Sequence, residues 1–473
     1  MIALNSYLIE NFRSYGPKQR VPLRKINFLF GPNSHGKSTA LTALSILANY
    51  FMKRKFTVSK IEHVDNSPDI VLRDNVINNL SGKDTFTLSC EFLTSDKFDR
   101  QLILEPSFEL ENLSDGRPVK FSLFEHFEGE KDLFFELKDD LVTINFDSYY
   151  YRDSLRTLNY SSRKVDEKDP FDKGEKTYES IDIDWLNLRL KNPPPSFGWS
   201  EEFQMQTFIK DDESVSEKRK IVQFLNNEID KLFGLFQFSW QTNLVGWIGP
   251  NRTILNNNIS VNHEKGFIDD RFLNKKAIDK MNDWLKSTDT IDIPYQFVLH
   301  ESYSKAGLLV KEYGLIDQDS GNFLTLYEVG SGIAHIFLIL LAFFNDLVGL
   351  IIQQPEIHLH PALQVQLARA MIELTNEKKG DEYFQLIIET HSEHFIKAAQ
   401  LEIARNLNSE ESNFKKEFLS VLYISKDKSR FSKVKQMELD ETGAFTEPWP
   451  DDFFELSADL SLERLRQSYK SKN

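Results

Sequence analysis

Residues 31–38 read Gly31-Pro32-Asn33-Ser34-His35-Gly36-Lys37-Ser38 and match the phosphate-binding pattern G-x-x-x-x-G-K-[ST]. In this pattern, backbone N–H groups of the loop and of the helix that follows surround the phosphates. Lys37 is expected to reach the β and γ phosphate oxygens, and the Ser38 hydroxyl to bind Mg²⁺. An apolar, strand-like run, Ile26–Phe30, precedes the loop, and apolar residues at helical spacing follow it between 40 and 48. The sequence therefore predicts an ATP or GTP site in an α/β fold.

The α/β pattern is interrupted by a long insertion. Short alternating β runs between about 85 and 151 predict an antiparallel meander, and the chain from about 152 to 300 reads as polar and irregular with a helical stretch near 216–233. Helices and strands alternate again after about 306, as in parallel-sheet units. We expect an N-terminal lobe at 1–84, an α+β insertion at 85–305, a C-terminal lobe at 306–405, and strands with an aromatic tail at 406–473.

Composition narrows the class of protein. The 473 residues carry 57 basic and 72 acidic side chains, a formal charge of −15, which argues against a whole-surface nucleic-acid binder. A single cysteine, Cys90, cannot form an internal disulfide, and the N-terminus lacks the pattern of a secretion signal, so we expect a cytoplasmic protein. The longest apolar run, Ile336–Ile352, is shorter than a bilayer span and reads as a buried helix followed by a buried strand. We expect no membrane contact.

Four further motifs occur in a fixed order along the chain. They are Asn11-Phe12-Arg13-Ser14, then Val329-Gly330-Ser331-Gly332, then Leu350–Glu356 with His358-Leu359-His360-Pro361 behind it, and finally Thr390-His391-Ser392. With the phosphate loop, this ordered set resembles the ABC-type ATPase heads of the RecF, SMC and OLD group. The resemblance covers the first 50 residues and about 325–400. It implies a split ABC-type P-loop ATPase head with a mixed β-sheet.

The resemblance also implies roles for individual residues. Ser331 and Gly332 look like the signature motif, which would meet the γ-phosphate held by a second protomer, so ATP would be sandwiched in a homodimer or higher homo-oligomer. His391 looks like the switch histidine that contacts the γ-phosphate. The nucleotide contacts implied in this way are Arg13, Asn33, Gly36, Lys37, Ser38, Thr39, Ser331, Gly332 and Gln353. An alternative remains open, in which His358, His360, His391 and His394 form a metal cluster.

The Walker B segment departs from the family pattern. Two acids are expected at the end of its strand, one for Mg²⁺ and one to polarise the attacking water, but the chain has Gln353 and Gln354. An amide cannot take a proton from water, so general-base catalysis at 354 is lost. Glu356, the one carboxylate in the segment, or Glu389 from the adjacent strand end is the candidate to substitute. We expect firm ATP binding with slow hydrolysis, or hydrolysis only when a partner completes the site.

Two fragments narrow the resemblance further. Trp247–Arg252, and the closing Gly443–Phe445 with Trp449–Phe454, resemble segments of ATPases from bacterial anti-phage operons, such as the Septu ATPase, which carries an HNH-type nuclease, and the PARIS ATPase, which holds a toxic nuclease. The resemblance implies an ATPase subunit with a separate nuclease encoded in the same operon. A RecF-like repair ATPase at DNA ends or gaps is the alternative, and direct DNA contact stays open. An OLD-like enzyme with its own nuclease is disfavoured, because the last 70 or so residues lack an acidic two-metal arrangement.

Overall fold

The computed structural model describes most of the chain in separate stretches. They are 3–53, 83–95, 101–111, 118–138, 141–145, 175–178, 181–184, 187–190, 221–227, 229–230, 245–249, 275–303, 309–326, 328–347, 349–377, 384–408 and 414–449. They belong to two compact units. The first comprises Met1–Val21, Thr39–Glu62 and Ile70–Thr242, and the second Pro22–Ser38, His63–Asp69 and Asn243–Asn473. Each unit is described by itself.

A six-stranded sheet forms the centre of the second unit. Its strands lie in the order β12 (Val245–Ile248), β16 (Gly349–Gln353), β17 (Gln385–Glu389), β3 (Ile26–Phe30), β18 (Leu419–Lys426) and β19 (Ser432–Gln436). All neighbouring strands are parallel except β18 and β19, which are antiparallel. The central strands are mainly apolar and are buried along their whole length, as is typical of parallel strands covered on both faces. The predicted mixed α/β class is confirmed.

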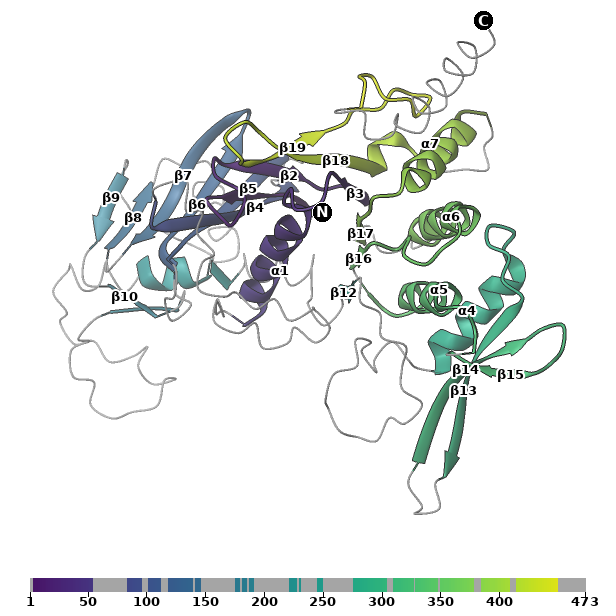
Figure 1. Ribbon diagram of the computed structural model, residues 1–473. Helices are drawn as coiled ribbons and strands as arrows, with labels where there is room; N and C mark the ends of the chain where they lie inside the picture. The colour runs from purple at the N-terminus through teal and green to yellow at the C-terminus, as the bar shows by residue number, and fades with distance from the viewer. Residues whose placement is uncertain are drawn as a thin grey trace, which may run out of the picture. The chain divides into compact units, whose positions relative to one another are not determined.

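Helices α5 (Ser331–Phe343), α6 (Pro361–Glu377) and α7 (Glu393–Asn408) lie side by side along one face of this sheet (Figure 1). Every residue of α5 from Ala334 to Phe343 is buried, which explains why its sequence is apolar on all sides. The predicted buried helix and buried strand in the longest apolar run are thus α5 and β16. Within the described residues, no helix is long and apolar enough to cross a membrane.

The segment from 152 to 300 is more regular than its sequence suggested. Helix α4 (Lys275–Ser287) packs against α5, and β13 (Tyr295–Tyr303), β14 (Leu309–Asp317) and β15 (Phe323–Thr325) form an antiparallel sheet. The interpretation of 152–300 as an irregular stretch was therefore wrong for α4 and β13, whereas β14 and β15 lie beyond that segment. Four apolar side chains of α4 at helical spacing were the missed signal: Ala277, Ile278, Met281 and Trp284.

Strand β12 lies in the six-stranded sheet, although its residues fall in the segment 85–305 that the sequence assigned to the insertion. The boundaries of the four expected domains stay predictions. Of the helical stretch expected near 216–233, residues 221–227 and 229–230 are helical, and the remainder is outside the described residues. The same holds for 146–151, for 250–252 and for the tail beyond 449.

The end of the described chain packs on the strand before the phosphate loop. The Trp449 ring lies 5.7 Å from the Phe30 ring and 5.6 Å from the Tyr423 ring, centroid to centroid, in edge-to-face geometry. The Phe445 ring joins this cluster, 5.0 Å from the Trp449 ring, centroid to centroid. Edge-to-face pairs of this kind contribute about 0.5–1.5 kcal/mol each beyond the area that they bury. Residues 445–449 therefore help to hold the end of β3 in place.

The first unit contains an eight-stranded sheet. Its strands lie in the order β2 (Gln19–Pro22), β1 (Ala3–Glu10), β4 (Thr85–Ser95), β5 (Gln101–Glu111), β6 (Pro118–Phe127), β7 (Glu130–Lys138), β8 (Leu141–Asn145) and β9 (Glu175–Tyr178). Every pair from β1 to β9 is antiparallel, so the predicted meander is confirmed. Strands β10 (Ile181–Asp184) and β11 (Asn187–Leu190) form a separate hairpin. Helix α1 (Lys37–Lys53) begins in the second unit and continues into the first.

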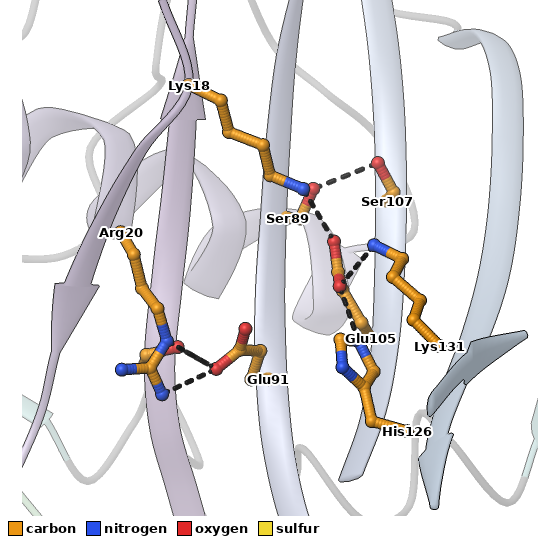
Figure 2. Close-up of polar contacts among 9 residues, drawn as sticks. Lys18, Arg20, Ser89, Glu91, Glu105, Ser107, His126 and Lys131 are labelled. Atoms are coloured by element: carbon orange, nitrogen blue, oxygen red, sulfur yellow. Dashed lines mark hydrogen bonds and ion pairs between the residues drawn. The ribbon is translucent and has the colours of Figure 1, made fainter. Parts of the chain in front are cut away.

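A network of ion pairs lies on the eight-stranded sheet (Figure 2). The Glu105 carboxylate, only 1% exposed, accepts hydrogen bonds from Lys18 at 3.0 Å, His126 at 2.7 Å and Lys131 at 2.6 Å. Burial alone raises the pKa of Glu105, but these hydrogen bonds from three donors lower it to about 2. Glu105 is therefore a charged anchor that joins β5, β6, β7 and the segment before β2.

Replacing Glu105 is expected to destabilise the protein in a pH-dependent way. A carboxyl pKa of about 2 in the folded state, against about 4.5 in the unfolded state, corresponds to about 3 kcal/mol of folding stability at pH 7. Because Lys18 and Lys131 are partly exposed to solvent, we expect Glu105→Gln to lower the free energy of unfolding by slightly less, about 2–3 kcal/mol. A depressed carboxyl pKa stabilises the fold above about pH 4.5, and this contribution is lost as the pH falls towards 2. Urea unfolding at pH 7 and pH 3 measures it.

The difference in unfolding free energy between wild type and Glu105→Gln should fall to less than about half at pH 3. Glu130→Gln, which removes an exposed carboxylate from the same sheet, is the control and should differ from wild type by less than about 0.5 kcal/mol. An equal cost for the Glu105 variant at both pH values would contradict the argument.

Candidate nucleotide-binding site

Three of the predicted motifs lie at the carboxyl ends of the parallel strands: the phosphate loop, the Walker B segment and Thr390-His391-Ser392. Strand β3 ends at Phe30 and leads into the phosphate loop, while β16 and β17 end at Gln353 and Glu389. The register pairs Gln353 with Glu389 across the two strands, and Glu389 with Leu29 of β3. Ligands of open α/β sheets bind at this edge, outside the carboxyl ends of the strands.

The phosphate loop is held by the strands at the end of the sheet. Its backbone takes positive φ angles at Gly31 (142°), Ser34 (61°) and Gly36 (113°). A Cβ atom at Gly31 would lie 2.0 Å from the carbonyl oxygen of Ile424 in β18, so a larger residue there has no room. The Ser432 hydroxyl of β19 donates to the carbonyl oxygen of His35 at 2.6 Å. The loop is therefore shaped by β18 and β19, and its predicted contact residue Asn33 is exposed.

Lys37 is folded back onto its own loop. Its side chain is buried, and Nζ donates to the carbonyl oxygens of Gly31 at 2.9 Å and Pro32 at 3.0 Å. Burial lowers the pKa of Lys37, although the carboxylates of Glu389 and Glu356 act in the opposite direction. The ammonium group thus stands at the centre of the loop, with two carboxylates of the sheet edge near it.

A chain of hydrogen bonds runs across the strand ends. The Ser38 hydroxyl donates to Oε1 of Glu389 at 2.9 Å, and Nε2 of Gln353 donates to Oε2 of Glu389 at 2.6 Å. The indole Nε1 of Trp247, in β12, donates to Oε1 of Gln353 at 3.3 Å. Glu389 and Gln353 are both buried. Sequence reasoning missed Trp247 as a site residue, although it noted the motif that contains it.

Glu356 is bound to the loop that follows β17. Its Oε2 accepts from the Thr390 hydroxyl at 2.8 Å, and its Oε1 accepts from the backbone N–H of His391 at 2.8 Å. The Nε2 atom of His391 is buried and has no hydrogen-bond partner within the described part of the chain. Burial and the charge of Lys37 lower the pKa of His391 to about 4, so the ring is neutral at pH 7. A buried ring nitrogen without a partner is a candidate contact for a ligand.

The two residues expected to form the signature motif, Ser331 and Gly332, begin α5. Ser331 is the first residue of the helix and is half-buried, and the exposed Gly330 caps it. A Cβ atom at Gly332 would lie 2.5 Å from the carbonyl oxygen of His358, so the glycine lets α5 approach the segment after β16. Among the described contacts, Ser331 and Gly332 do not join the hydrogen-bonded group around Glu389.

Two predicted contact residues belong to the first unit. Arg13 has a φ of 51°, and its guanidinium carbon lies 5.6 Å from the centre of the Phe12 ring. Burial lowers the pKa of Arg13. Thr39 follows Ser38 in α1.

The expected alternative of a histidine metal cluster does not hold. In the described residues, the group of side chains close enough to bind a metal ion is Glu91, Glu105 and His126, whose ligand atoms lie within 4.8 Å of one another. Its carboxylates are already paired with Lys18, Lys131 and Arg20. His358, His360, His391 and His394 form no such group.

Comparison with known proteins assigns the family. The chain is similar to the solved SMC head domain from Thermotoga maritima, with 9% identity, a TM-score of 0.40 and coverage of 92% of this chain and 100% of that chain. It is also similar to the Smc head domain with an extended coiled coil bound to the C-terminal domain of ScpA, derived from Pyrococcus furiosus, with 11% identity, a TM-score of 0.40 and coverage of 98% and 100%. No curated protein matches the chain. The family model described as AAA ATPase domain matches residues 3–396, most of the chain, and the protein therefore belongs to the AAA ATPase domain family.

Proposed function

We propose that this ATPase binds ATP tightly, hydrolyses it slowly, and acts as the nucleotide-gated subunit of a two-component anti-phage complex whose nuclease is a separate chain. The observation that carries the proposal is the contrast at the sheet edge. Lys37 and Ser38 of the phosphate loop are in place, while the end of β16 carries the amides Gln353 and Gln354 where the ABC-type resemblance expects acids. Such a site favours holding a nucleotide over consuming it.

The residues of the site fit ATP with Mg²⁺. Ser38 and Glu389 offer a hydroxyl and a carboxylate 2.9 Å apart, and oxygen atoms are the ligands that Mg²⁺ prefers. Bound Mg²⁺ would neutralise part of the phosphate charge. Lys37 would replace its hydrogen bonds to two carbonyl oxygens of the loop with hydrogen bonds to phosphate oxygens. The γ-phosphate would become the partner of the buried Nε2 atom of the neutral His391 ring.

Slow hydrolysis follows from the side chains around the expected water site. Gln354 cannot accept a proton, and both oxygens of Glu356 already accept hydrogen bonds from Thr390 and His391. Glu356, His391 and Glu389 remain the proposed catalytic group. Within it, we assign Glu356 to positioning His391, because it binds the backbone of that loop.

Ser331 tests the proposed nucleotide sandwich. In the proposed sandwich, Ser331 and the start of α5 contact the γ-phosphate held by a second copy. Ser331→Arg should abolish ATP-dependent dimers, because a bulky cation would occupy the interface between the two copies. ATP binding itself should change less than about threefold. Sedimentation velocity with ATP and Mg²⁺ measures the dimer. Ser429→Arg, in the exposed turn between β18 and β19, is the matched control. An unaltered dimer in the Ser331 variant would count against the sandwich.

Purification from the native operon tests the assignment to defence. The tagged ATPase is isolated with ATP and Mg²⁺, and the co-purifying chain is identified and assayed for nuclease activity. We expect a nuclease chain that is retained with ATP and reduced at least about fivefold in the Lys37→Ala protein. Recovery of gapped or broken DNA with repair proteins, and of no nuclease, would favour the RecF-like alternative.

A further inference from the structure

The site lacks an acid at the place where the family resemblance puts the metal-binding carboxylate. That place is residue 353, at the end of β16, and it carries an amide. Mg²⁺ in a phosphate-loop site is held by the loop hydroxyl together with a carboxylate. A carboxylate beside Ser38 must therefore come from another strand if the site is to hold the metal.

Glu389 is that neighbour. It is the last residue of β17, directly in register with Gln353 of β16, and its side chain is 4% exposed. Its Oε1 accepts a hydrogen bond from the Ser38 hydroxyl, and its Oε2 accepts one from the Gln353 amide. We propose that Glu389 is the carboxylate that holds Mg²⁺ beside Ser38, and that Gln353 and Trp247 are positioning residues that orient it.

The donor and acceptor chemistry fixes the direction of this chain. The indole N–H of Trp247 can only donate, so the oxygen of the Gln353 amide faces Trp247 and its NH₂ group faces Glu389. The amide therefore presents a donor to the carboxylate and fixes one of its oxygens, while the other oxygen stays at Ser38. Trp247 thus acts on Glu389 through Gln353.

The same geometry shows what an acid at residue 353 would do in the site before Mg²⁺ binds. A glutamate there would place a second carboxylate against Glu389, across the 2.6 Å contact that Gln353 now bridges, at a buried position. Two buried carboxylates at that distance cannot both stay ionised without a cation between them. The amide at the end of β16 is therefore compatible with the acid at the end of β17. In this arrangement the metal-binding carboxylate lies on β17, one strand away from the position at which the family resemblance expects it.

This inference rests on the proposed function, because it assumes that ATP binds with Mg²⁺. The experiment measures the dissociation constant of ATP in Mg²⁺ and in EDTA, and the binding of Mn²⁺ to the protein with ATP by electron paramagnetic resonance. We expect wild type to bind ATP at least about tenfold more tightly with Mg²⁺. The ratio of the ATP dissociation constant in EDTA to that in Mg²⁺ should fall to about twofold or less in Glu389→Gln. This variant should bind ATP in EDTA at least as tightly as wild type, because a negative charge near the phosphates is gone.

Trp247→Phe tests the positioning role. It keeps a buried aromatic ring but removes the donor to Gln353, and it should lower the ratio about threefold while the affinity in EDTA stays within twofold. Glu441→Gln, which removes an exposed carboxylate of the same unit, should keep the wild-type ratio. A wild-type ratio and Mn²⁺ signal in Glu389→Gln would overturn the metal assignment, and a wild-type ratio in Trp247→Phe would overturn the positioning role.

Folding failure and failure of the proposed function give different results. If Glu389→Gln does not fold, Glu389→Asp, which keeps the charge but is one methylene shorter, decides: a ratio lowered at least threefold supports the assignment, and a wild-type ratio overturns it. If wild type binds ATP in neither buffer, the proposed function itself is wrong. If wild type binds ATP equally in both, ATP binding stands and the metal assignment falls.

Discussion

Lys37→Ala is expected to weaken ATP binding by at least about 100-fold. The ammonium group of Lys37 lies at the centre of the phosphate loop and is buried there by the loop itself. Charge-assisted hydrogen bonds contribute roughly 1.5–3 kcal/mol each, so the loss of two such bonds to phosphate oxygens accounts for a factor of this size. Titration with a fluorescent ATP analogue, or calorimetry, measures the effect.

The substitution also acts on the protein without nucleotide. It leaves the carbonyl oxygens of Gly31 and Pro32 without their donor, and it removes the positive charge near Glu389 and Glu356. The proposed function further predicts that protection against phage is lost together with ATP binding. Lys435→Ala, at an exposed lysine of β19, is the control and should bind ATP as wild type does. An affinity within about fivefold of wild type in the Lys37 variant would contradict the site.

Gln354→Glu is expected to speed ATP hydrolysis by about 100-fold in single-turnover assays. A positioned general base contributes about 10²–10⁴-fold, and we take the lower end because the carboxylate would share the sheet edge with Glu389 and Glu356. The backbone of residue 354 is already fixed, since its N–H donates to the carbonyl oxygen of Glu389 at 2.6 Å. Glutamate has nearly the shape of glutamine, so the change adds a base without repacking the strand end.

The control for this prediction keeps the amide. Residue 354 has a φ of 48°, in the left-handed region that asparagine tolerates better than most residues, so Gln354→Asn should fold and hydrolyse ATP within about twofold of wild type. Rapid turnover by the wild-type protein that stops in Gln354→Asn would show that the amide itself takes part in catalysis, and the explanation of slow hydrolysis would then be wrong.

Local sequence patterns were enough to predict the pieces of the ATPase fold. The strand before the phosphate loop, the helix after it, and the buried helix and strand of the run Ile336–Ile352 each carry a pattern within a few residues, and β3, α1, α5 and β16 lie where these patterns placed them. The meander of the first unit was visible for the same reason. Each pattern reports the environment of its own strand or helix, so no distant part of the chain had to be known.

The contacts inside the site were beyond such patterns. The hydrogen bond from Ser38 to Glu389 depends on β17 lying between β16 and β3, and strand order is a property of the whole sheet. The link from Trp247 to Gln353 depends on β12 joining that sheet from a segment more than 100 positions away in the chain. The requirement for Gly332 arises from the backbone of His358, which periodicity does not reveal.

The contacts of β18, β19 and Trp449 with β3 and the phosphate loop limit how far the ATPase can be truncated from its C-terminal side. Residues 3–396 match the family model, yet the carbonyl of Ile424, the hydroxyl of Ser432 and the ring of Trp449 all bear on β3 or the loop that follows it. A fragment that ends at residue 396, where the family match ends, would lack β18 and β19. It would therefore expose one edge of β3 and leave the phosphate loop without the two strands that contact it. The shortest piece that retains nucleotide affinity should therefore extend to residue 449, about 50 residues beyond the boundary that homology suggests.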